Sequence, residues 1–339
     1  MDLHEQTTEA PEVEPSARVL VGDAAQSLRT LSNHSAHCAI TDPPYGLTSG
    51  LDVQELATAW SKGETFVNTK TGYAGNDWDN TVPGPELWSE VHRVLHPGGF
   101  VLAFAASRTV GLTSLALELA GFEVRDLIHW TYATGQIRTQ DLSSQHERTY
   151  GVPCPELEGL RSTLRPGHEP IVVARKALAS TTVLDSELEQ HTGAIRHGSQ
   201  LLSNVWHTHD LGCTPRQCVC GADCSNTCIT HIYPGATVTS SSLYCAKPSR
   251  SERPETSEGV YHDTVKPLSL MRTLVRAFTK SGQTVLDPFL GSGTTAEAAL
   301  LEQRQVIGCE RDTTYVELIR QRLIRIGASE EPMSGDPSE

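Results

Sequence analysis

Short apolar runs alternate along the chain with segments whose apolar residues recur every three to four positions. A short apolar run is typical of a buried strand, and the three-to-four spacing is typical of a helix with one buried face. Strands are predicted at residues 18–21, 36–41, 100–105, 123–131, 171–174, 284–286 and 305–308. Helices are predicted at residues 25–31, 86–95, 113–120, 268–279, 294–302 and 315–326. This alternation predicts an α/β fold with helices on both faces of a mostly parallel sheet.

Two stretches lack this periodicity. Residues 46–82 are polar, with Gly, Thr, Asn and two Trp, and we expect a long irregular loop that serves as a lid or contact loop. Residues 178–260 are dominated by Ser, Thr, His and Cys and are the best candidate for an inserted segment. With 339 residues, the chain is expected to form one large domain with such an insertion, or two domains.

Both ends of the chain are acidic, rich in Pro, Ser or Thr and poor in large apolar residues. This composition predicts disordered tails at residues 1–17 and 328–339. The tails hold nine of the charges behind the net charge of −14, which leaves a body of about −5. Basic residues gather within 161–176 and 247–276, and each group fits either a DNA-binding cleft or a solvated surface.

No apolar run approaches the length that spans a membrane, and the acidic start of the chain lacks a signal segment. We therefore expect a cytoplasmic protein with no membrane partner.

The sequence Asp42-Pro43-Pro44-Tyr45 directly follows one predicted strand. The two prolines remove two backbone donors and leave the carbonyl of Pro43 as an acceptor beside the Asp42 carboxylate. Two such acceptors match the two hydrogens of an exocyclic amine and localise its lone pair on nitrogen. Tyr45 offers a face on which a base removed from its stack can lie. Considered alone, the tetrapeptide fits an ordinary Pro-rich turn equally well.

A second chemical signature is a strand that ends at Asp287, followed by a glycine-containing loop and the start of a helix. Gly291 and Gly293 let the backbone approach a cofactor closely, and the helix start at Thr294 offers NH groups to an anion. Glu310 lies 23 residues after Asp287, behind the next strand, where a carboxylate can accept both hydroxyls of a ribose. The spacing also fits the loose dinucleotide fingerprint, so a nicotinamide-dependent oxidoreductase is an alternative.

Several separated segments together resemble the DNA amino-methyltransferases, which move a methyl group from S-adenosylmethionine to N6 of adenine or N4 of cytosine. These segments are residues 42–45, 93–99, 168–176, 244–247, 262–267 and 287–293. The tetrapeptide precedes the glycine loop, which is the motif order of the family's beta class. The resemblance implies a Rossmann-like, seven-stranded, mostly parallel sheet that closes only when the two ends of the chain meet.

By this resemblance, the tetrapeptide Asp42, Pro43, Pro44 and Tyr45 holds the target amine. Lys266 and Pro267 flank the methionine end of S-adenosylmethionine, and Asp23 lies near its adenine. The full set of expected cofactor-binding residues is Asp23, Lys266, Pro267, Asp287, Phe289, Gly291, Gly293, Thr294 and Glu310. Asp263 departs from the family, which more often has Pro between the His and the Thr of that segment.

The motif order divides the chain into a catalytic half at residues 18–177, a Cys-rich target-recognition segment at 178–260 and a cofactor-binding half at 261–327. The expected activity is methylation of adenine N6 in double-stranded DNA, by direct in-line transfer to a base flipped out of the duplex. Asp at the first position of the tetrapeptide favours adenine in this family, and cytosine N4 is the alternative target. A cognate restriction endonuclease is a candidate partner.

Methylation of cytosine at C5 would need a nucleophilic thiolate, typically in a Pro-Cys pair. Pro153-Cys154 is such a pair, but Pro155-Glu156 follows it, and the amine motif lies elsewhere in the sequence. We therefore interpret Cys154 as a structural residue.

Five cysteines crowd into sixteen residues beside several histidines. Because disulfides are rare in a reducing cytosol, this density indicates a tetrahedral zinc site that orders the segment. Free thiols in an irregular loop are the alternative, since the spacing lacks paired C-x-x-C units. The candidate structural zinc ligands are Cys213, Cys218, Cys220, Cys224 and Cys228.

Overall fold

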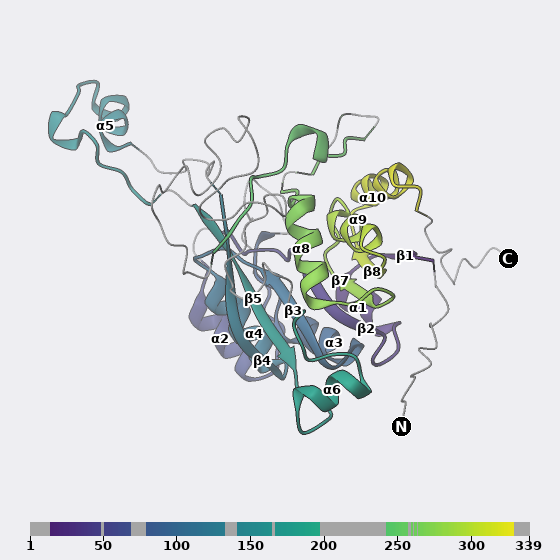
Figure 1. The fold of residues 1–339 in the computed structure, drawn as a ribbon. Helices are drawn as coiled ribbons and strands as arrows, with labels where there is room; N and C mark the ends of the chain where they lie inside the picture. Colours follow the sequence, from purple (N-terminus) through teal and green to yellow (C-terminus); the bar gives the residue numbers. More distant parts are fainter. Residues whose placement is uncertain are drawn as a thin grey trace, which may run out of the picture.

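The computed structural model describes residues 14–48, 51–68, 79–132, 141–164, 167–196, 242–256, 259, 261, 262 and 264–328. These residues form one eight-stranded sheet in the order β1-β8-β7-β2-β3-β5-β4-β6 (Figure 1). The strands are β1 (Ala17–Val21), β2 (Ala36–Thr41), β3 (Leu95–Phe104), β4 (Phe122–Thr131), β5 (His168–Lys176), β6 (Ser242–Tyr244), β7 (Thr284–Asp287) and β8 (Gln305–Glu310). The helices are α1 (Ala24–Arg29), α2 (Val53–Ser61), α3 (Pro85–Val94), α4 (Val110–Leu119), α5 (Leu142–Tyr150), α6 (Val183–Glu189), α8 (Leu268–Phe278), α9 (Thr294–Leu301) and α10 (Thr313–Arg325).

Most of this sheet is parallel, as the sequence predicted. Within the described sheet, β5 alone runs against its two neighbours, β3 and β4, while the remaining pairings are parallel. All seven predicted strands are present, and the three-residue β6 adds an eighth at the edge beside β4. The predicted α/β Rossmann-like fold is therefore confirmed.

Strands from the two ends of the chain lie side by side. Ala17 in β1 is opposite Val306 in β8, and Cys38 in β2 is opposite Val285 in β7. Because these four strands are parallel, their carboxyl ends face the same edge of the sheet. The segments that follow β1, β2, β7 and β8 therefore meet at that edge, although most of the chain separates them.

Successive residues of β2 face two separate hydrophobic cores. Cys38 and Ile40 pack with apolar residues of α8, α9 and α10, whereas Ala39 packs with those of α1, α2, α3 and α4. Figure 1 shows the two groups of helices on opposite faces of the sheet. All three residues are fully buried, which explains why residues 38–40 form a continuous apolar run instead of alternating with polar residues.

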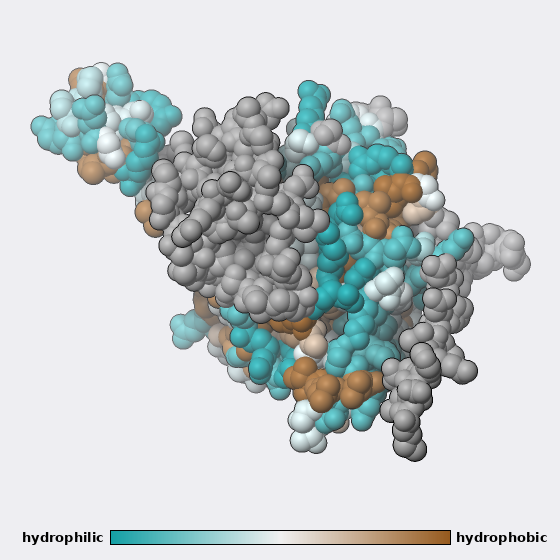
Figure 2. Space-filling model, in the orientation of Figure 1, coloured by the Kyte–Doolittle hydropathy of each residue, from teal (hydrophilic) through white to brown (hydrophobic). Residues whose placement is uncertain are grey.

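Because β5 is antiparallel, it ends at the amino edge of the parallel strands, opposite the carboxyl edge where the segments after β1, β2, β7 and β8 meet. At the amino edge Gly98 N donates to the carbonyl of Ala177 at 3.1 Å, and α6 follows. Figure 2 shows a hydrophobic patch where α6 lies, and Leu184 and Leu188 are 66% and 69% exposed. The strand β6 ends at the carboxyl edge, with Tyr244 opposite Thr131, the last residue of β4. The segment 178–260 therefore begins at one edge of the sheet and ends at the other.

The irregular loop predicted at residues 46–82 is wrong in part, because α2 forms within it. Asp52 caps this helix by accepting a hydrogen bond from Glu55 N, and Leu56 and Trp60 are its buried residues. Two buried residues one turn apart are too few repeats of the three-to-four spacing to predict a helix. The sequence also missed α5, which has no buried residue, and α6, whose one buried residue is a serine.

The expected acidic tails lie mostly outside the described residues, which begin at 14 and end at 328. The first tail ends earlier than predicted, because Ser16 N donates to Gln305 Oε1 at 2.9 Å and Ala17 belongs to β1. At the other end, Ala328 packs against the core formed by α8, α9 and α10. No helix among the described residues is long and apolar enough to cross a membrane.

His37 is the second residue of β2 and lies at the amino edge of the sheet, away from the segments that follow β1, β2, β7 and β8. Its ring stacks on that of His96 at 4.5 Å between centroids, and its Nδ1 accepts a hydrogen bond from Thr284 N at 3.1 Å. Burial, and then the nearby His96 and His191, lower the pKa of His37 to about 4. The imidazole is therefore neutral in the folded protein at neutral pH.

This lowered pKa predicts a loss of stability in acid. Between pH 6.5 and 4 the unfolded chain protonates His37 and the folded chain does not, so unfolding becomes easier as the pH falls. The full effect approaches about 3 kcal/mol. We expect His37→Asn, whose amide oxygen can replace Nδ1 as acceptor, to flatten the pH dependence of urea unfolding in this interval. His146→Asn, in α5 and remote from the His37 cluster, is the control, and an equal slope in both variants would contradict the assignment.

Candidate active site

The segments that follow β1, β2, β7 and β8 line a cavity of about 1270 Å³ at the carboxyl edge of the sheet. Single-ligand pockets measure roughly 300–1,000 Å³, so this one has room for two ligands side by side. The predicted site residues that line it are Asp23, Asp42, Pro43, Pro44, Tyr45, Lys266, Asp287, Phe289, Gly291, Thr294 and Glu310. Pro267 and Gly293 lie behind the lining, where they precede the first residues of α8 and α9.

Asp42 directly follows β2, and its two carboxylate oxygens have different surroundings. Oδ2 accepts a short hydrogen bond from Lys266 Nζ. Oδ1 is buried and receives no hydrogen bond from any residue that the structure describes. Burial, together with repulsion from Glu169, raises the pKa of Asp42 despite the opposing charge of Lys266. The site therefore contains a buried acceptor oxygen with elevated basicity.

Lys266 lies between two carboxylates, with only 7% of its side chain exposed. Besides Asp42, its Nζ contacts Glu169 Oε2 at 3.5 Å. The same nitrogen is 5.4, 5.2 and 5.9 Å from the ring centroids of Tyr45, Phe104 and Trp130, within the range of cation–π attraction. Burial opposes the charge of Lys266, but Asp42 and Glu169 outweigh it and keep its pKa above the ordinary value.

Lys266 has a contact that the sequence-based expectation did not include. The resemblance assigned it to the methionine end of the cofactor. The structure places its amino group on the carboxylate of the tetrapeptide, 224 residues away in sequence. Lys266 therefore belongs to the immediate surroundings of Asp42.

The backbone and side chain of Tyr45 are fixed by four hydrogen bonds at or next to this residue. Asp79 Oδ1 accepts from Tyr45 N at 2.7 Å and from Gly46 N at 2.9 Å, while Thr109 Oγ1 donates to the Tyr45 carbonyl at 2.8 Å. The phenol donates to Glu169 Oε2 at 3.0 Å. Burial, and then Asp42 and Glu169, raise the pKa of Tyr45 far above its usual value, so it remains a neutral donor.

Gly46 turns the chain after the tetrapeptide with φ of +64°. A Cβ at this position would lie 3.0 Å from Val82 N, so a larger residue would collide with backbone. The turn thus needs glycine for both its conformation and its space.

Two important residues were missed by the sequence analysis. Glu169 belongs to one of the segments that carried the family resemblance, but nothing in that segment assigned it a role. Asp79 is 3% exposed and holds the turn, yet no motif surrounds it in sequence. Both act through long-range contacts, which appear only once the strands are paired.

The glycine loop is held from below by buried hydrogen bonds. Asp287 Oδ1 accepts from Thr41 Oγ1 at 2.7 Å and from Phe289 N at 3.0 Å, which joins the ends of β2 and β7. Burial raises the pKa of Asp287 to about 6, although these donors and Thr295 oppose the shift. Gly291 and Gly293 take φ of +54° and +81°, which only glycine adopts without strain.

Glu310 connects two loops at the end of β8. Its Oε2 accepts from Gly291 N at 2.8 Å, and its Oε1 accepts from Asp312 N at 2.8 Å. Each carboxylate oxygen has a second lone pair, so these bonds leave acceptor capacity toward the cavity. Asp23, at the end of β1, is exposed and accepts from Gln26 N at 3.1 Å as the cap of α1.

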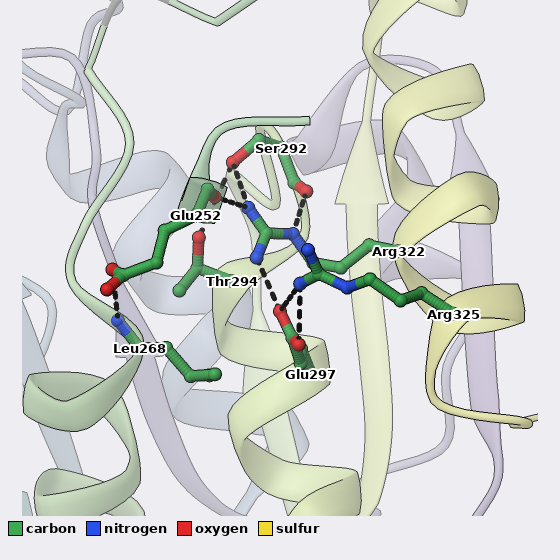
Figure 3. Close-up of polar contacts among 7 residues, drawn as sticks. All are labelled: Glu252, Leu268, Ser292, Thr294, Glu297, Arg322 and Arg325. Carbon is green, nitrogen blue, oxygen red and sulfur yellow. Dashed lines mark hydrogen bonds and ion pairs between the residues drawn. The ribbon is translucent and has the colours of Figure 1, made fainter. Parts of the chain in front are cut away.

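Arg322 lies beneath the glycine loop, with 1% of its side chain exposed (Figure 3). Its Nε donates to the Ser292 carbonyl at 2.8 Å and its Nη2 to the Glu252 carbonyl at 3.0 Å. Glu297, itself 3% exposed, pairs with Arg322 and also accepts from Arg325 at 2.7 and 2.9 Å. This network ties α9 and α10 to the loop and to the end of the 178–260 segment.

His262 packs against the loop from the cavity side. Its Nδ1 accepts from Thr264 N at 3.2 Å, and its ring lies 4.5 Å from that of Tyr315. Burial, followed by the charge of Lys266, lowers the pKa of His262 to about 4. A Cβ on Gly291 would lie 3.1 Å from its Nε2, so the close approach of this ring is a second reason for glycine there.

The structure describes Cys154 but not the cysteines predicted to bind zinc. Cys154 does not line it, and a hydrogen bond to Glu156, ahead of desolvation, raises the thiol's pKa. This is the opposite of an activated thiolate. The candidate zinc ligands Cys213, Cys218, Cys220, Cys224 and Cys228 lie outside the described residues, within which no metal-binding group of His, Cys, Asp or Glu occurs.

Comparison with known proteins shows similarity along nearly the whole chain. The type II methyltransferase M.HindIII of Haemophilus influenzae is 28% identical over 323 residues, which cover 89% of this chain and 93% of the relative. The type II methyltransferase M.HinfI of Haemophilus influenzae is 22% identical over 91% of this chain and 68% of the relative.

Solved structures show the same fold. PvuII DNA methyltransferase (cytosine-N4-specific) superposes with a TM-score of 0.55 and 13% identity, covering 95% of this chain and 89% of that one. M1.HpyAVI has a TM-score of 0.50 and 16% identity, covering 91% of this chain and 98% of that one. At these identities the likeness shows the fold alone.

A model of the N6_N4_Mtase family, described as DNA methylase, matches residues 36–321. This span begins with β2 and extends into α10, so it includes both the tetrapeptide and the glycine loop. The chain therefore belongs to the N6/N4 DNA methylase family.

Proposed function

We propose that the protein methylates N6 of adenine in double-stranded DNA. The observation that carries an exocyclic amine as the target is Asp42 Oδ1, the buried oxygen that accepts no hydrogen bond from the described residues. Adenine is chosen over cytosine because Asp at the first position of the tetrapeptide favours adenine in this family. An unsatisfied buried acceptor costs roughly 1–3 kcal/mol, and more when charged, so a ligand that brings a donor here gains that energy. The exocyclic amine of a flipped base is such a donor.

The contacts of the tetrapeptide divide the work among its groups. Lys266 occupies Oδ2 of Asp42 and leaves Oδ1 without a hydrogen bond from the described residues, as the acceptor for the ligand. One N–H of the amine donates to Oδ1 and the other to the Pro43 carbonyl, which localises the lone pair on nitrogen. Tyr45 lies beside both groups and supplies the aromatic face for the base.

Asp42 also provides a destination for a proton. Methylation places a positive charge on the amine nitrogen, which then releases one of its hydrogens. Asp42 Oδ1 is the acceptor already bonded to that hydrogen in the proposed complex. Its pKa, raised chiefly by burial, makes it a better base than an exposed carboxylate.

DNA methylases of this family use S-adenosylmethionine, which supplies, when bound, a sulfonium methyl group that the amine attacks in line. We assign its binding to the other side of the cavity, where the carboxylates Asp23, Asp287 and Glu310 surround the glycine loop. Their negative charge suits a ligand with a cationic sulfonium and ammonium. The start of α9 at Thr294 adds backbone NH groups next to the same loop.

Recognition of the DNA sequence is proposed for the segment 178–260. Its first helix, α6, follows β5 at the edge away from the cavity, so contacts with DNA fall to residues after α6. Lys247 and Arg253, near the end of the segment, line the cavity and can reach a phosphate. Similarity to two type II methyltransferases supports a role as the modification partner of a restriction endonuclease.

The target base is predicted to be adenine. We expect incubation with methyl-labelled S-adenosylmethionine and enzymatically amplified, unmethylated DNA to label N6-methyladenine, identified by digestion to nucleosides and chromatography. Label in N4-methylcytosine would assign the activity to the other amine, because the same two acceptors serve both. Absence of label in any nucleoside, on DNA of varied sequence, would contradict the proposed activity.

Asp42 is predicted to act in transfer and not in cofactor binding. Asp42→Ala should lower kcat by at least about 10²-fold, the scale seen when a preorganised electrostatic contact is removed. The Kd for S-adenosylmethionine, measured by calorimetry, should change less than about threefold, since a kcat-specific loss marks a contact made in the transition state. The exposed Asp126→Asn is the matched control. Wild-type kcat in Asp42→Ala would remove Asp42 from the mechanism.

Asp287 is predicted to favour binding at the expense of stability. Its folded pKa of about 6 exceeds the ordinary value of 3.8, so the folded state bears a cost above pH 6 that disappears as the pH falls to 3.8. Asp287→Asn should therefore stabilise the protein by up to about 3 kcal/mol at pH 8 and much less at pH 4.5. Urea unfolding at both pH values checks this. Calorimetry should show weaker S-adenosylmethionine binding, and an equal gain at both pH values would contradict the explanation.

A further inference from the structure

Glu169 is a charged residue of the cavity to which the proposed reaction assigns no task. It is the second residue of β5, and 17% of its side chain is exposed. Its Oε2 accepts from Tyr45 Oη at 3.0 Å and lies 3.5 Å from Lys266 Nζ, while its Oε1 lies 3.9 Å from Lys247 Nζ. The Glu169 carboxylate therefore contacts both Lys266, which pairs with Asp42, and Tyr45, which lies beside Asp42.

The direction of β5 explains how Glu169 reaches this place. The parallel strands deliver their carboxyl ends to the cavity, whereas the antiparallel β5 delivers its amino end. Glu169 pairs in register with Trp130, near the carboxyl end of β4, and Trp130 lines the cavity with it. The backbone of the sheet thus fixes the position of Glu169 independently of the loops.

Glu169 competes with Asp42 for the single proton of the Tyr45 phenol. Both carboxylates are within hydrogen-bonding reach of that hydroxyl. In the structure the phenol donates to Glu169, and Asp42 Oδ1 keeps its free lone pairs. Without Glu169, the phenol would donate to Asp42 and compete with the amine for it.

Glu169 also shares the positive charge of Lys266. An ammonium that pairs with Asp42 alone would lower the basicity of that carboxylate most strongly. The second carboxylate divides this attraction and adds repulsion of its own. The charged or titratable groups that face Asp42 are Lys266, Glu169, Tyr45 and Asp287, with Lys247 behind Glu169.

We propose that Glu169 is a positioning residue for methyl transfer, which keeps Asp42 free to bind the amine by holding the Tyr45 hydroxyl and sharing Lys266. This inference rests on the proposed function of Asp42. It assigns Glu169 no contact with the base or with the methyl donor. Its two roles separate cleanly, since Glu169→Gln retains the acceptor for Tyr45 and loses only the charge, whereas Glu169→Ala loses both.

The test measures kcat, its pH profile and the Kd for S-adenosylmethionine in both variants, using unmethylated amplified DNA. Glu169→Gln should lower kcat about tenfold and move its acidic limb to lower pH by about one unit, the effect of one charge at this distance. Glu169→Ala should lose roughly tenfold more, as expected for a lost hydrogen bond to a charged group. The Kd for S-adenosylmethionine should stay within about threefold in each, because neither change touches the glycine loop.

A double variant distinguishes positioning from a general loss of structure. Tyr45→Phe removes the hydroxyl that competes for Asp42, so the double variant Tyr45→Phe, Glu169→Ala should be no slower than Glu169→Ala alone. Simple additivity of the two losses would contradict the proposed competition. Glu123→Gln is the matched control, since Glu123 pairs with Arg175 on the same two strands and does not line the cavity.

The outcomes separate this inference from the proposed function. If wild-type protein methylates DNA and Asp42→Ala does not, but Glu169→Gln keeps the wild-type kcat and pH profile, only the role of Glu169 fails. If Asp42→Ala remains active, the proposed function of Asp42 fails and the role of Glu169 falls with it. A fall in melting temperature with unchanged kcat would make Glu169 a stabilising residue only.

Discussion

The ion pair between Asp42 and Lys266 forms only when strands from both ends of the chain pair in one sheet. Its partners are 224 residues apart: Asp42 directly follows the central strand β2, and Lys266 lies two residues before α8. They meet because β2 lies between β3 and β7, and that placement requires strands from both ends of the chain to pair. Folding must therefore be essentially complete before the tetrapeptide acquires its electrostatic surroundings, and long-range closure of this kind is expected to be slow.

The carboxyl edge of the sheet contains several charged groups whose burial lowers the stability of the fold. Asp42, Lys266 and Asp287 are charged residues in or beside a buried environment, and burial works against each charge. Lys266 offsets part of this cost for Asp42, while Thr41 and the loop backbone offset part of it for Asp287. The compensation is incomplete for Asp42, whose Oδ1 accepts no hydrogen bond from the described residues, and under the proposed function this oxygen receives the amine.

The sequence predicted the parts of the site that are contiguous in the chain. The tetrapeptide and the glycine loop each combine a strand end with residues of special conformation, and these signals are local. Glu169 and Asp79 escaped prediction because their roles arise from contacts with Tyr45 that form only in the folded chain, 124 and 34 residues apart in sequence. The helix α2 escaped because two buried residues suffice to dock it, whereas β2 was unmistakable because it is buried on both faces. Lys266 shows the same limit, since its motif was identified but its contact with Asp42 was not.

The reversed direction of β5 has a consequence for how this protein can vary. The chain enters β5 at the cavity and leaves it about 30 Å away, given nine residues at roughly 3.3 Å each. The lobe that contains α5 precedes this entry and stands apart from the body in Figure 1. Lengthening or shortening that lobe changes the chain that leads into β5 at the cavity, while the sheet register keeps Glu169 in place. Insertions after β5, by contrast, begin at the far edge. The same strand therefore separates a position where length variation can alter access to the site from one where it can remain remote from the chemistry.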